Sequence, residues 1–508
     1  MRAEASPAPD PGVRRPAWVS AALAVGGGVA WGLSHAAHPL PGLAWVALVP
    51  LFLLLGAPRP GRWGLLFGIV SWCVAIPWIV PTITVYGGLD GWLAGLALLL
   101  LATCLGAYVA LFAALGGRLF RAGDALSLAA LPALWVALEW LRAHLISGFP
   151  WNLAAYAWTN VHGALPLASW IGAYGVSAVV LVPSLGLALA IVRRDWKIGA
   201  GALLAVGALL PIAARWGVVD ESDEPPVEAF VVQPDTPNRP LFDAAENAAD
   251  YRRLVALTER VCRPGVLVLW PESAAWPRAY PGSTDLVDDV RRFAARGCGV
   301  LFNSPVEAGE RTFNSVLLAT PGGELERADK RHLVPFGEYV PLRRLLPFLG
   351  TIARGIGDFS PADSISLLEF QGARLGAAVC YEVVFPEEVA ALVDAGANAL
   401  VTVTNDAWYG DTSAPWQHLR AARFRAAENH RWMLRAAITG VSARIAPDGS
   451  LWGTLGVGAE GNLEALFQPR TDRTLYSRAP WLVPLLCTLF ALAALARCSL
   501  RTRRGRSR

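Results

Sequence analysis

Eight apolar stretches, each close to the length of a membrane span, constrain this chain more than any other feature. A helix needs about 20 mostly apolar residues to cross the hydrocarbon core of a bilayer. Glycine and proline within such stretches are compatible with helices in lipid. The sequence therefore predicts a polytopic α-helical membrane protein with about eight transmembrane helices. The predicted spans are residues 17–37, 41–57, 63–81, 91–115, 125–145, 164–192, 198–214 and 479–496.

Basic residues between these spans indicate how the bundle is oriented, because short loops rich in Lys and Arg stay on the cytoplasmic side. The N-terminal tail and the even-numbered loops are basic, and the odd-numbered loops carry almost no positive charge, with Arg142 as the main exception. A further arginine cluster follows the last span. Both termini are therefore predicted to be cytoplasmic, which puts the region between the seventh and eighth spans outside, in a periplasm or an equivalent compartment. The basic residues are Arg2, Arg14, Arg15, Arg59, Arg62, Arg118, Arg121, Arg193, Arg194, Lys197, Arg497, Arg501, Arg503, Arg504, Arg506 and Arg508.

Two other interpretations of the chain ends are less favoured. The net charge is only +4, and an arginine cluster directly after a membrane span is explained by topology and anionic headgroups rather than by nucleic acid. The first apolar stretch resembles a signal peptide, since small residues follow it at 34–37. Cleavage there would leave seven spans and would not change the side on which the polar region lies.

The polar region is predicted to be a layered α/β domain. Short β-branched runs alternate in it with helix-like segments, and about 250 residues can bury a full core. The expected organisation is a basic tail at 1–16, a bundle at 17–216, a linker at 217–226, a catalytic domain at 227–478, an eighth helix at 479–496 and a second basic tail at 497–508.

Three cysteines fall within this domain. An oxidising compartment permits a disulfide between Cys262 and Cys298 and leaves Cys380 unpaired. The alternative is that Cys262 and Cys298 are small buried hydrophobic residues. No CxxC pair or His/Cys cluster at ligand spacing is present, so neither a metal nor a cofactor is predicted.

Glu272, Lys330 and Cys380 are the candidate reactive residues, and each stands just past or near a short apolar run. A carboxylate, an amine and a thiol are the groups needed to form and resolve a thioester. Cys380 is the predicted nucleophile and Glu272 the predicted base. Lys330 would stabilise the thiolate and the oxyanion that develops when an ester is attacked. Acyl chemistry is therefore the leading hypothesis.

Six short motifs lie around these residues and in the bundle: Trp270-Pro-Glu272, Lys330 with His332-Leu-Val-Pro-Phe-Gly-Glu338, Cys380-Tyr-Glu382, Asn405-Asp-Ala-Trp-Tyr-Gly-Asp411, Glu139-Trp-Leu-Arg142 and Gly148-Phe-Pro-Trp151. Taken together, they resemble the motifs of the apolipoprotein N-acyltransferase family, a membrane-embedded branch of the nitrilase, or carbon-nitrogen hydrolase, superfamily. Any one motif is weak, but the first four in the order of the family, beside a matching layout of spans, are highly specific.

The resemblance implies an αββα nitrilase-like sandwich carried on the periplasmic side of a bacterial inner membrane. It also implies the substrates. An acyl chain would move from a glycerophospholipid, through a Cys380 thioester in a ping-pong cycle, to the α-amine of a diacylglyceryl-cysteine apolipoprotein, in the last step of lipoprotein maturation. Glu338, Tyr381 and Glu382 would support the site; the alternatives are a structural hydrogen bond for the two carboxylates and core packing for Tyr381.

The remaining candidates are aromatic residues and histidines. Trp151, Trp276, Trp408 and Tyr409 would line an acyl-chain route or act as interface anchors. A Cys/His dyad using His332, His418 or His430 is less favoured, because such histidines usually satisfy local hydrogen bonds.

Three alternative functions remain open at this stage. A membrane-anchored nitrilase-type amidase or hydrolase would use the same three residues with water as the acceptor. An inactive nitrilase-like interaction domain would lack one of the three, and all are present. A transporter would suit the spans but would explain none of the motifs in the polar region.

Overall fold

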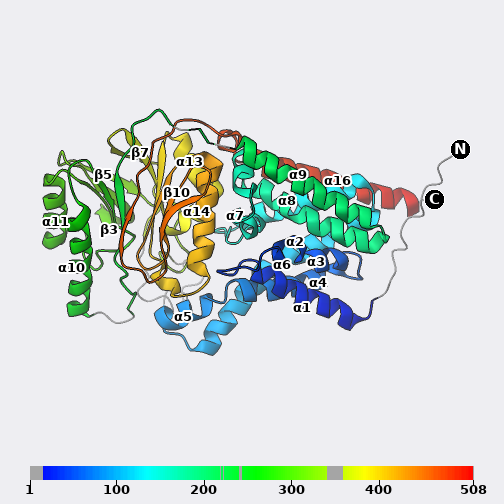
Figure 1. Ribbon diagram of the computed structural model, residues 1–508. Helices are drawn as coiled ribbons and strands as arrows, with labels where there is room; N and C mark the ends of the chain where they lie inside the picture. Colours follow the sequence, from blue (N-terminus) through cyan, green and yellow to red (C-terminus); the bar gives the residue numbers. More distant parts are fainter. Residues whose placement is uncertain (1–14, 218, 221, 240–242, 340–358, 507–508) are drawn as a thin grey trace. The chain divides into compact units, whose positions relative to one another are not determined.

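The computed structural model describes residues 15–217, 219–220, 222–239, 243–339 and 359–506, with side chains up to residue 502. Most of the predicted N-terminal tail lies outside these residues. The chain forms two compact units, residues 1–217 with 481–508 and residues 218–480. The first unit is helical, and the second contains both β-sheets (Figure 1).

The helical unit packs through small residues, as membrane bundles do. A Cβ added to Gly68 on α4 would lie 2.6 Å from the Cα of Gly106 on α6, so both glycines are needed for this close approach. The helices of this unit are α1 (Ala17–Leu33), α2 (Leu43–Val46), α3 (Val49–Leu54), α4 (Pro60–Ala75), α5 (Ile79–Gly87), α6 (Gly91–Ala122), α7 (Ala125–His144), η1 (Ala154–Trp158), α8 (Ala164–Arg193), α9 (Trp196–Trp216) and α16 (Leu482–Arg506).

The prediction of about eight spans is confirmed in part. Among the described residues, five helices are long and apolar enough to cross a membrane: α6, α7, α8, α9 and α16 over Leu482–Thr502. A sixth is counted if α4 and α5, which are bent by 57° at their break, form one span. The stretches 17–37 and 41–57 contain only shorter apolar helices.

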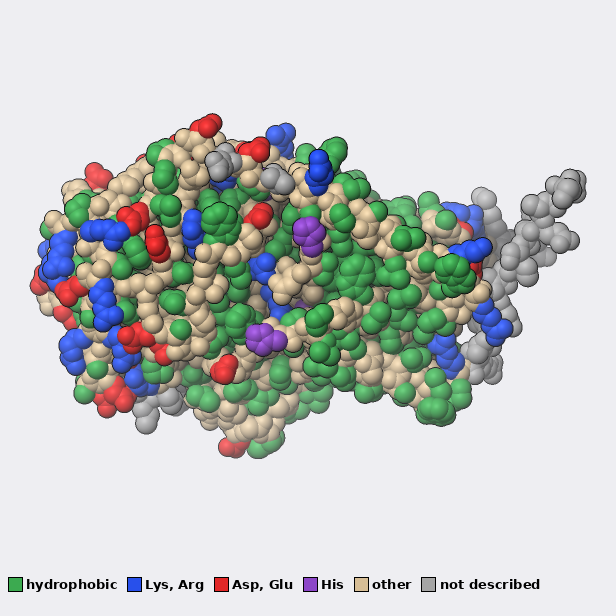
Figure 2. Space-filling model, in the orientation of Figure 1, with side chains coloured by type: hydrophobic (Ala, Val, Ile, Leu, Met, Phe, Trp, Pro, Cys, Tyr) green, Lys and Arg blue, Asp and Glu red, His purple; other side chains and the backbone are tan. Residues whose placement is uncertain are grey.

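Prolines explain two of these differences. Proline has no N–H to donate to the fourth preceding carbonyl and clashes with it, so helices break near it. Pro50 stands just after the break between α2 and α3, and Pro77 stands in the break between α4 and α5. Figure 2 shows that the surface of the helical unit in this view is mostly hydrophobic, with Lys and Arg side chains gathered at one end of it.

The second unit is a two-sheet sandwich, as predicted. One six-stranded sheet has the order β12-β1-β2-β3-β4-β5, and the other has the order β11-β10-β9-β8-β7-β6. In each sheet the central pairs, β1–β2–β3 and β7–β8–β9, are parallel, and the outer pairs are antiparallel. The strands are β1 (Ala229–Gln233), β2 (Leu267–Leu269), β3 (Gly299–Ala308), β4 (Arg311–Ala319), β5 (Leu325–Asp329), β6 (Leu368–Phe370), β7 (Ala373–Val379), β8 (Ala399–Thr404), β9 (Met433–Ala437), β10 (Ser442–Ile445), β11 (Leu451–Leu455) and β12 (Gly461–Glu464).

Helices cover the outer faces of both sheets (Figure 1). Helices α10 (Ala244–Val261) and α11 (Thr284–Ala295) lie on the first sheet, and α13 (Pro386–Asp394) and α14 (Ala414–Asn429) lie on the second. Short helices η2 (Cys380–Val384), η3 (Asp406–Tyr409) and α15 (Leu475–Arg478) follow strands or loops. The αββα layering expected from the resemblance is confirmed.

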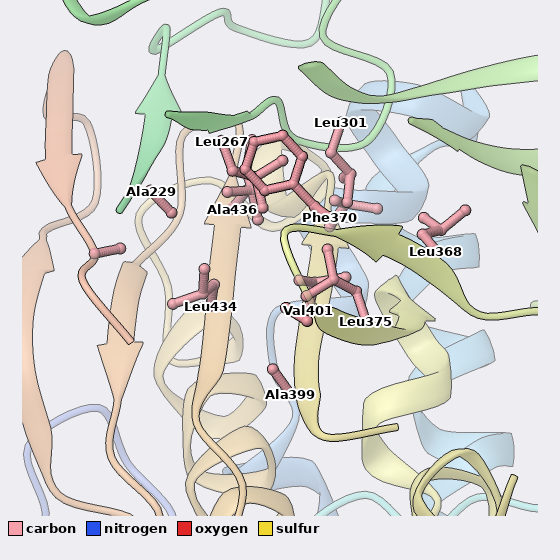
Figure 3. Packing of buried hydrophobic residues seen from close by; sticks show 14 of the residues in the cluster. Ala229, Leu267, Leu301, Leu368, Phe370, Leu375, Ala399, Val401, Leu434 and Ala436 are labelled. Carbon is pink, nitrogen blue, oxygen red and sulfur yellow. The ribbon is translucent and has the colours of Figure 1, made fainter. Parts of the chain in front are cut away.

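The core lies between the two sheets (Figure 3). Leu267 and Leu301 of the first sheet face Leu375 and Val401 of the second, and all four side chains are fully buried. Burying one such side chain contributes about 1.5–3 kcal/mol. This core fixes the ends of β2, β7 and β8, from which the candidate reactive residues extend.

A disulfide joins Cys262, at the end of α10, to Cys298, just before β3. The predicted pairing is therefore present, and Cys380 remains a free thiol. Disulfides persist in oxidising compartments, so this bond agrees with a domain outside the cytoplasm.

Candidate active site

Cys380 directly follows β7 and opens η2, where its backbone takes a φ of 53°. Positive φ is uncommon for a residue other than glycine, and such conformations require support from their surroundings. Glu382 provides that support. Its Oε2 accepts a hydrogen bond from the N–H of Val379 at 2.7 Å, and its Oε1 accepts from the N–H groups of Arg331 and His332 at 2.7 and 3.0 Å. Glu382 thus ties the nucleophile turn to the segment that carries Lys330.

Lys330 follows β5 and is 1% exposed. Its Nζ lies 3.0 Å from the carboxylate of Glu338 and 3.8 Å from Oε1 of Glu272. Burial by itself lowers the pKa of Lys330, but the charges of Glu338 and Glu272 more than offset burial, so the pKa is raised. Lys330 is therefore held as an ammonium ion. Glu338 is itself fixed by the N–H of Val334, which donates to its Oε2 at 2.8 Å.

Glu272 follows β2 and receives donors from both sheets. The side-chain amide of Asn314 on β4 donates to its Oε1 at 3.1 Å, and the backbone N–H of Asn405, just after β8, donates to its Oε2 at 3.0 Å. Asn314 also donates to Oε1 of Glu338 at 2.7 Å. One amide therefore bridges the two carboxylates that flank Lys330.

Asn314 was not predicted from the sequence. Asn303 on β3 orients it, because the Nδ2 of Asn303 donates to Oδ1 of Asn314 at 2.6 Å. Both residues are buried, next to Phe302 on β3 and Phe313 on β4. A polar amide in a strand is a signal that could have identified them, since buried polar groups need partners.

The sulfur of Cys380 lies 3.3 Å from the hydroxyl oxygen of Thr404, at the end of β8. Burial raises the pKa of the Cys380 thiol, and the charge of Glu272 raises it further. Lys330 and Thr404 act in the opposite direction without reversing this result. The resting group is therefore a thiol, and its reaction requires a base rather than a preformed thiolate.

The predicted aromatic residues divide between the two units. Tyr409 ends η3 in the second unit, and burial raises the pKa of its phenol. Trp276 and Trp408 belong to the same domain and are 56% and 43% exposed. Trp151 belongs to the helical unit, where it is buried against Trp78 at a centroid distance of 5.3 Å.

Tyr381 and the three histidines have contacts of a structural kind. The ring of Tyr381 packs edge-on against Phe385 at 5.1 Å, and His332 lies 3.8 Å from the same phenyl ring. His430 pairs with Asp472 at 3.0 Å. His418 places Nε2 2.9 Å from the backbone carbonyl oxygen of Cys380. These contacts give no support to a Cys/His dyad.

The arrangement combines a thiol, a carboxylate and an ammonium group in a buried site built from both sheets. Such a site is suited to nucleophilic acyl chemistry, in which the carboxylate carries the proton and the ammonium group stabilises an oxyanion. Among the described residues, no cluster of His, Cys, Asp and Glu side chains has an arrangement that could hold a metal ion.

Comparison with solved structures gives matches that cover about half of this chain. A protein from Xanthomonas campestris, XC1258, described as a CN-hydrolase superfamily protein, is 21% identical and covers 51% of this chain and 96% of its own, with a TM-score of 0.36. An amidase from Nesterenkonia is 24% identical and covers 52% of this chain and 98% of its own, with a TM-score of 0.37.

Comparison of sequences covers almost the whole chain. Residues 27–185 match the model of the apolipoprotein N-acyltransferase N-terminal domain, and residues 231–474 match that of carbon-nitrogen hydrolase. The apolipoprotein N-acyltransferase of Geobacter metallireducens is 34% identical over 481 residues, which are 90% of this chain and 91% of the relative. That of Brucella suis is 33% identical over 485 residues, or 90% and 88% of the two chains. The resemblance found in the motifs is confirmed: the chain belongs to the apolipoprotein N-acyltransferase family of bacterial membrane proteins.

Proposed function

We propose that this protein transfers an acyl chain from a membrane glycerophospholipid to the N-terminal α-amine of a diacylglyceryl-cysteine lipoprotein, the last step of lipoprotein maturation. The observation that carries the proposal is the buried set of Glu272, Lys330 and Cys380, in a chain that matches apolipoprotein N-acyltransferases over 90% of its length. The transfer proceeds in two half-reactions through a thioester on Cys380.

In the first half-reaction, Glu272 takes the proton of the Cys380 thiol as the sulfur attacks the ester carbonyl of the phospholipid. The ammonium group of Lys330 stabilises the oxyanion of the tetrahedral intermediate, because it keeps its charge although it is buried. When the ester C–O bond breaks, Glu272 returns the proton to the departing oxygen. Lysophospholipid leaves, and the acyl chain remains on the sulfur.

In the second half-reaction, the α-amine of the lipoprotein attacks the thioester carbonyl. Glu272 takes the proton that the amine loses, and Lys330 again stabilises the oxyanion. The C–S bond then breaks, and the sulfur leaves as a thiolate that regains the proton from Glu272. Glu338 and Glu382 support this cycle by holding Lys330 and the nucleophile turn. Trp276, Trp408 and Tyr409 line the approach of the acyl chain.

The proposal includes a topology with eight crossings. These are α1, the α2–α3 pair, the α4–α5 pair and the five full-length helices. Both termini are then cytoplasmic, and the catalytic domain is periplasmic. The disulfide and the basic loops support this orientation. Labelling of introduced single cysteines by a membrane-impermeant maleimide in intact cells tests it; a labelled C-terminal tail would contradict it.

The acyl-enzyme is the decisive species for the function. Membranes containing the full chain are incubated with phospholipid carrying a labelled acyl chain, beside the Cys380→Ser and Glu272→Ala variants. A labelled adduct that hydroxylamine releases is expected in the wild type and in neither variant. Adding a diacylglyceryl-cysteine peptide should discharge the label onto its amine. Discharge to free fatty acid at the same rate with and without the peptide would show a hydrolase instead.

A further inference from the structure

A chain of buried polar side chains next to Cys380 takes no part in the cycle described above. It consists of Thr404, Asp406, His418 and Arg435. Thr404 ends β8 beside the end of β7, so its Oγ1 reaches to 3.3 Å from the Cys380 sulfur. The same oxygen lies 2.9 Å from Oδ1 of Asp406. Thr404 and Asp406 are both completely buried, so water does not compete for these hydrogen bonds.

Asp406 is held as an anion. Nη2 of Arg435 donates to its Oδ2 at 2.7 Å, and Nδ1 of His418 lies 3.1 Å from its Oδ1. Burial raises the pKa of Asp406, but the charge of Arg435, above all, lowers it to about 2. The carboxylate therefore accepts hydrogen bonds and takes no proton from its neighbours. The absence of a side chain at Gly440 leaves room for this carboxylate, since a Cβ there would lie 2.3 Å from Oδ2 of Asp406.

The same group of residues also holds the backbone of the nucleophile. A carbonyl oxygen only accepts hydrogen bonds, so Nε2 of His418 donates to the carbonyl oxygen of Cys380 across 2.9 Å. Asp406, Arg435 and His418 thus form one buried hydrogen-bonded cluster. This cluster supports the sulfur of Cys380 through Thr404 and the backbone carbonyl of Cys380 through His418.

Thr404 has a single hydroxyl hydrogen and two acceptors within reach. While Cys380 is a neutral thiol, the charged carboxylate of Asp406 is the stronger acceptor, so the threonine O–H donates to Asp406. Once Glu272 has taken the thiol proton, the sulfur can only accept. Burial lowers the pKa of His418, so its ring is neutral, with the one N–H on Nε2, and its Nδ1 accepts from Arg435. Asp406 keeps Arg435 as a charged donor, so it can release the threonine hydroxyl to the sulfur.

We propose that Thr404 is a catalytic hydroxyl switch, which turns from Asp406 to the sulfur whenever the sulfur becomes anionic and turns back when the sulfur is bonded to hydrogen or to an acyl carbon. In acylation the S–H bond breaks, the S–C bond forms and the proton goes to Glu272. In deacylation the S–C bond breaks and its electron pair returns to the sulfur. The switch only rotates, so no proton passes between Thr404 and its neighbours. It rests on the proposed function only in taking Cys380 as the nucleophile.

The test measures the reactivity of the thiol without any lipid substrate. The detergent-solubilised full chain is treated with iodoacetamide over a range of pH, and alkylation of Cys380 is followed by mass spectrometry. Thr404→Val removes the hydroxyl and keeps the branched shape. Since a hydrogen bond to a charged group is worth about 1.5–3 kcal/mol, alkylation near neutral pH should slow by about ten- to hundredfold, with the pH profile moved to higher pH.

Two matched variants separate the hydroxyl from packing. Thr404→Ser keeps the hydroxyl, and we expect a rate within about threefold of the wild type, because the bond to a charged sulfur is retained. Thr402→Val is the control: Thr402 lies two residues earlier on β8, is fully buried, and its Oγ1 makes no hydrogen bond with the described residues. It should alkylate like the wild type.

A wild-type pH profile for Thr404→Val, or an equal loss in Thr404→Ser, would overturn the switch. If Thr404→Val does not fold, Thr404→Ala decides, because it also removes the hydroxyl: its alkylation profile should move to higher pH, and an unmoved profile would overturn the switch. Failure of the proposed function is distinguishable, because a chain that alkylates as expected but forms no acyl-thioester would refute acyl transfer and leave the switch intact.

Discussion

Replacing Glu338 by Gln tests whether one ion pair keeps Lys330 charged. The carboxylate lies 3.0 Å from Nζ, and the two side chains are 11% and 1% exposed. Breaking a buried pair of this kind costs about 3–5 kcal/mol. Because Glu272 remains 3.8 Å from Nζ as a second partner, we expect the lower end, about 3 kcal/mol, in the free energy of unfolding.

Removing the charge of Glu338 should also shift the titration of Lys330. A free energy of about 1.4 kcal/mol corresponds to a tenfold change in proton affinity, so about 3 kcal/mol moves the titration down by about two pH units. In the wild type the pKa of Lys330 is raised, and the ammonium persists through the alkaline range. Its contribution to stability is fully present below the unfolded pKa of about 10.4 and is lost only as the pH rises through the higher folded pKa. In Glu338→Gln, the free energy of unfolding and the rate of acylation should both begin to fall at a lower pH than in the wild type.

The assay is the initial rate of labelled thioester formation between neutral and alkaline pH, with thermal unfolding measured on the same samples. Glu388→Gln is the matched control, since Glu388 forms an ion pair with Arg331 at 3.0 Å, and both side chains are 30% exposed. Exposed pairs of this kind contribute about 0–1 kcal/mol, so the control should keep the wild-type profile. An unchanged alkaline limb in Glu338→Gln, with unchanged unfolding, would refute the argument that Glu338 sustains the charge of Lys330.

Three further outcomes are expected. Glu272→Gln removes the base but keeps an oxygen for the Asn405 N–H, so thioester formation should fall by about 10²–10⁴-fold with little change in melting temperature; equal activity would exclude Glu272 as the base. Asn314→Leu removes the amide shared by two carboxylates, and single-turnover acylation should slow by about tenfold or more, since a hydrogen bond to a charged group is worth about 1.5–3 kcal/mol; an unchanged single-turnover rate would show that this bridge is dispensable. Replacing both Cys262 and Cys298 by Ser removes a disulfide with a sequence separation of 36, which should lower the free energy of unfolding by about 2–4 kcal/mol in denaturant titrations. Reductant should destabilise the wild type and have no such effect on the variant.

The sequence identified the membrane-spanning character of the first unit better than the extent of its helices. Hydropathy is an average over a window, so it detects the apolar stretch at 41–57 but not the break before Pro50 within it. The bend of 57° between α4 and α5 has the same origin, since Pro77 interrupts the backbone hydrogen bonds while leaving the hydropathy high. Hydropathy also misses the break within the long α8, which contains a non-helical residue, Gly172, and still counts as one apolar segment.

In the candidate site, the reactive residues could be predicted from the sequence, but some of the residues that orient them were not. Glu272, Lys330 and Cys380 were predicted because reactive side chains at the ends of strands carry a local signal. Asn314 and Thr404 carry a weaker signal, because an amide or a hydroxyl within a strand acquires its role from the side chains that neighbouring strands bring next to it. Asn314 meets Glu272 because β4 and β2 belong to one sheet, and it meets Glu338 through a loop 24 residues later.

Thr404 meets Cys380 because β7 and β8 are parallel neighbours in register, with Val379 opposite Val403. This register also explains why Thr402 and Thr404 differ, although both are buried threonines on the same face of one strand. The residue opposite Thr402 is Ala378, which offers no polar side chain, whereas Thr404 stands beside the sulfur and within hydrogen-bond distance of Asp406. Identical residues two positions apart therefore have different chemistry, and only the pairing of strands distinguishes them. If exchanging both hydroxyls for methyl groups had equal effects on Cys380, the contacts of Thr404 would have no more functional weight than those of any buried threonine in the sheet.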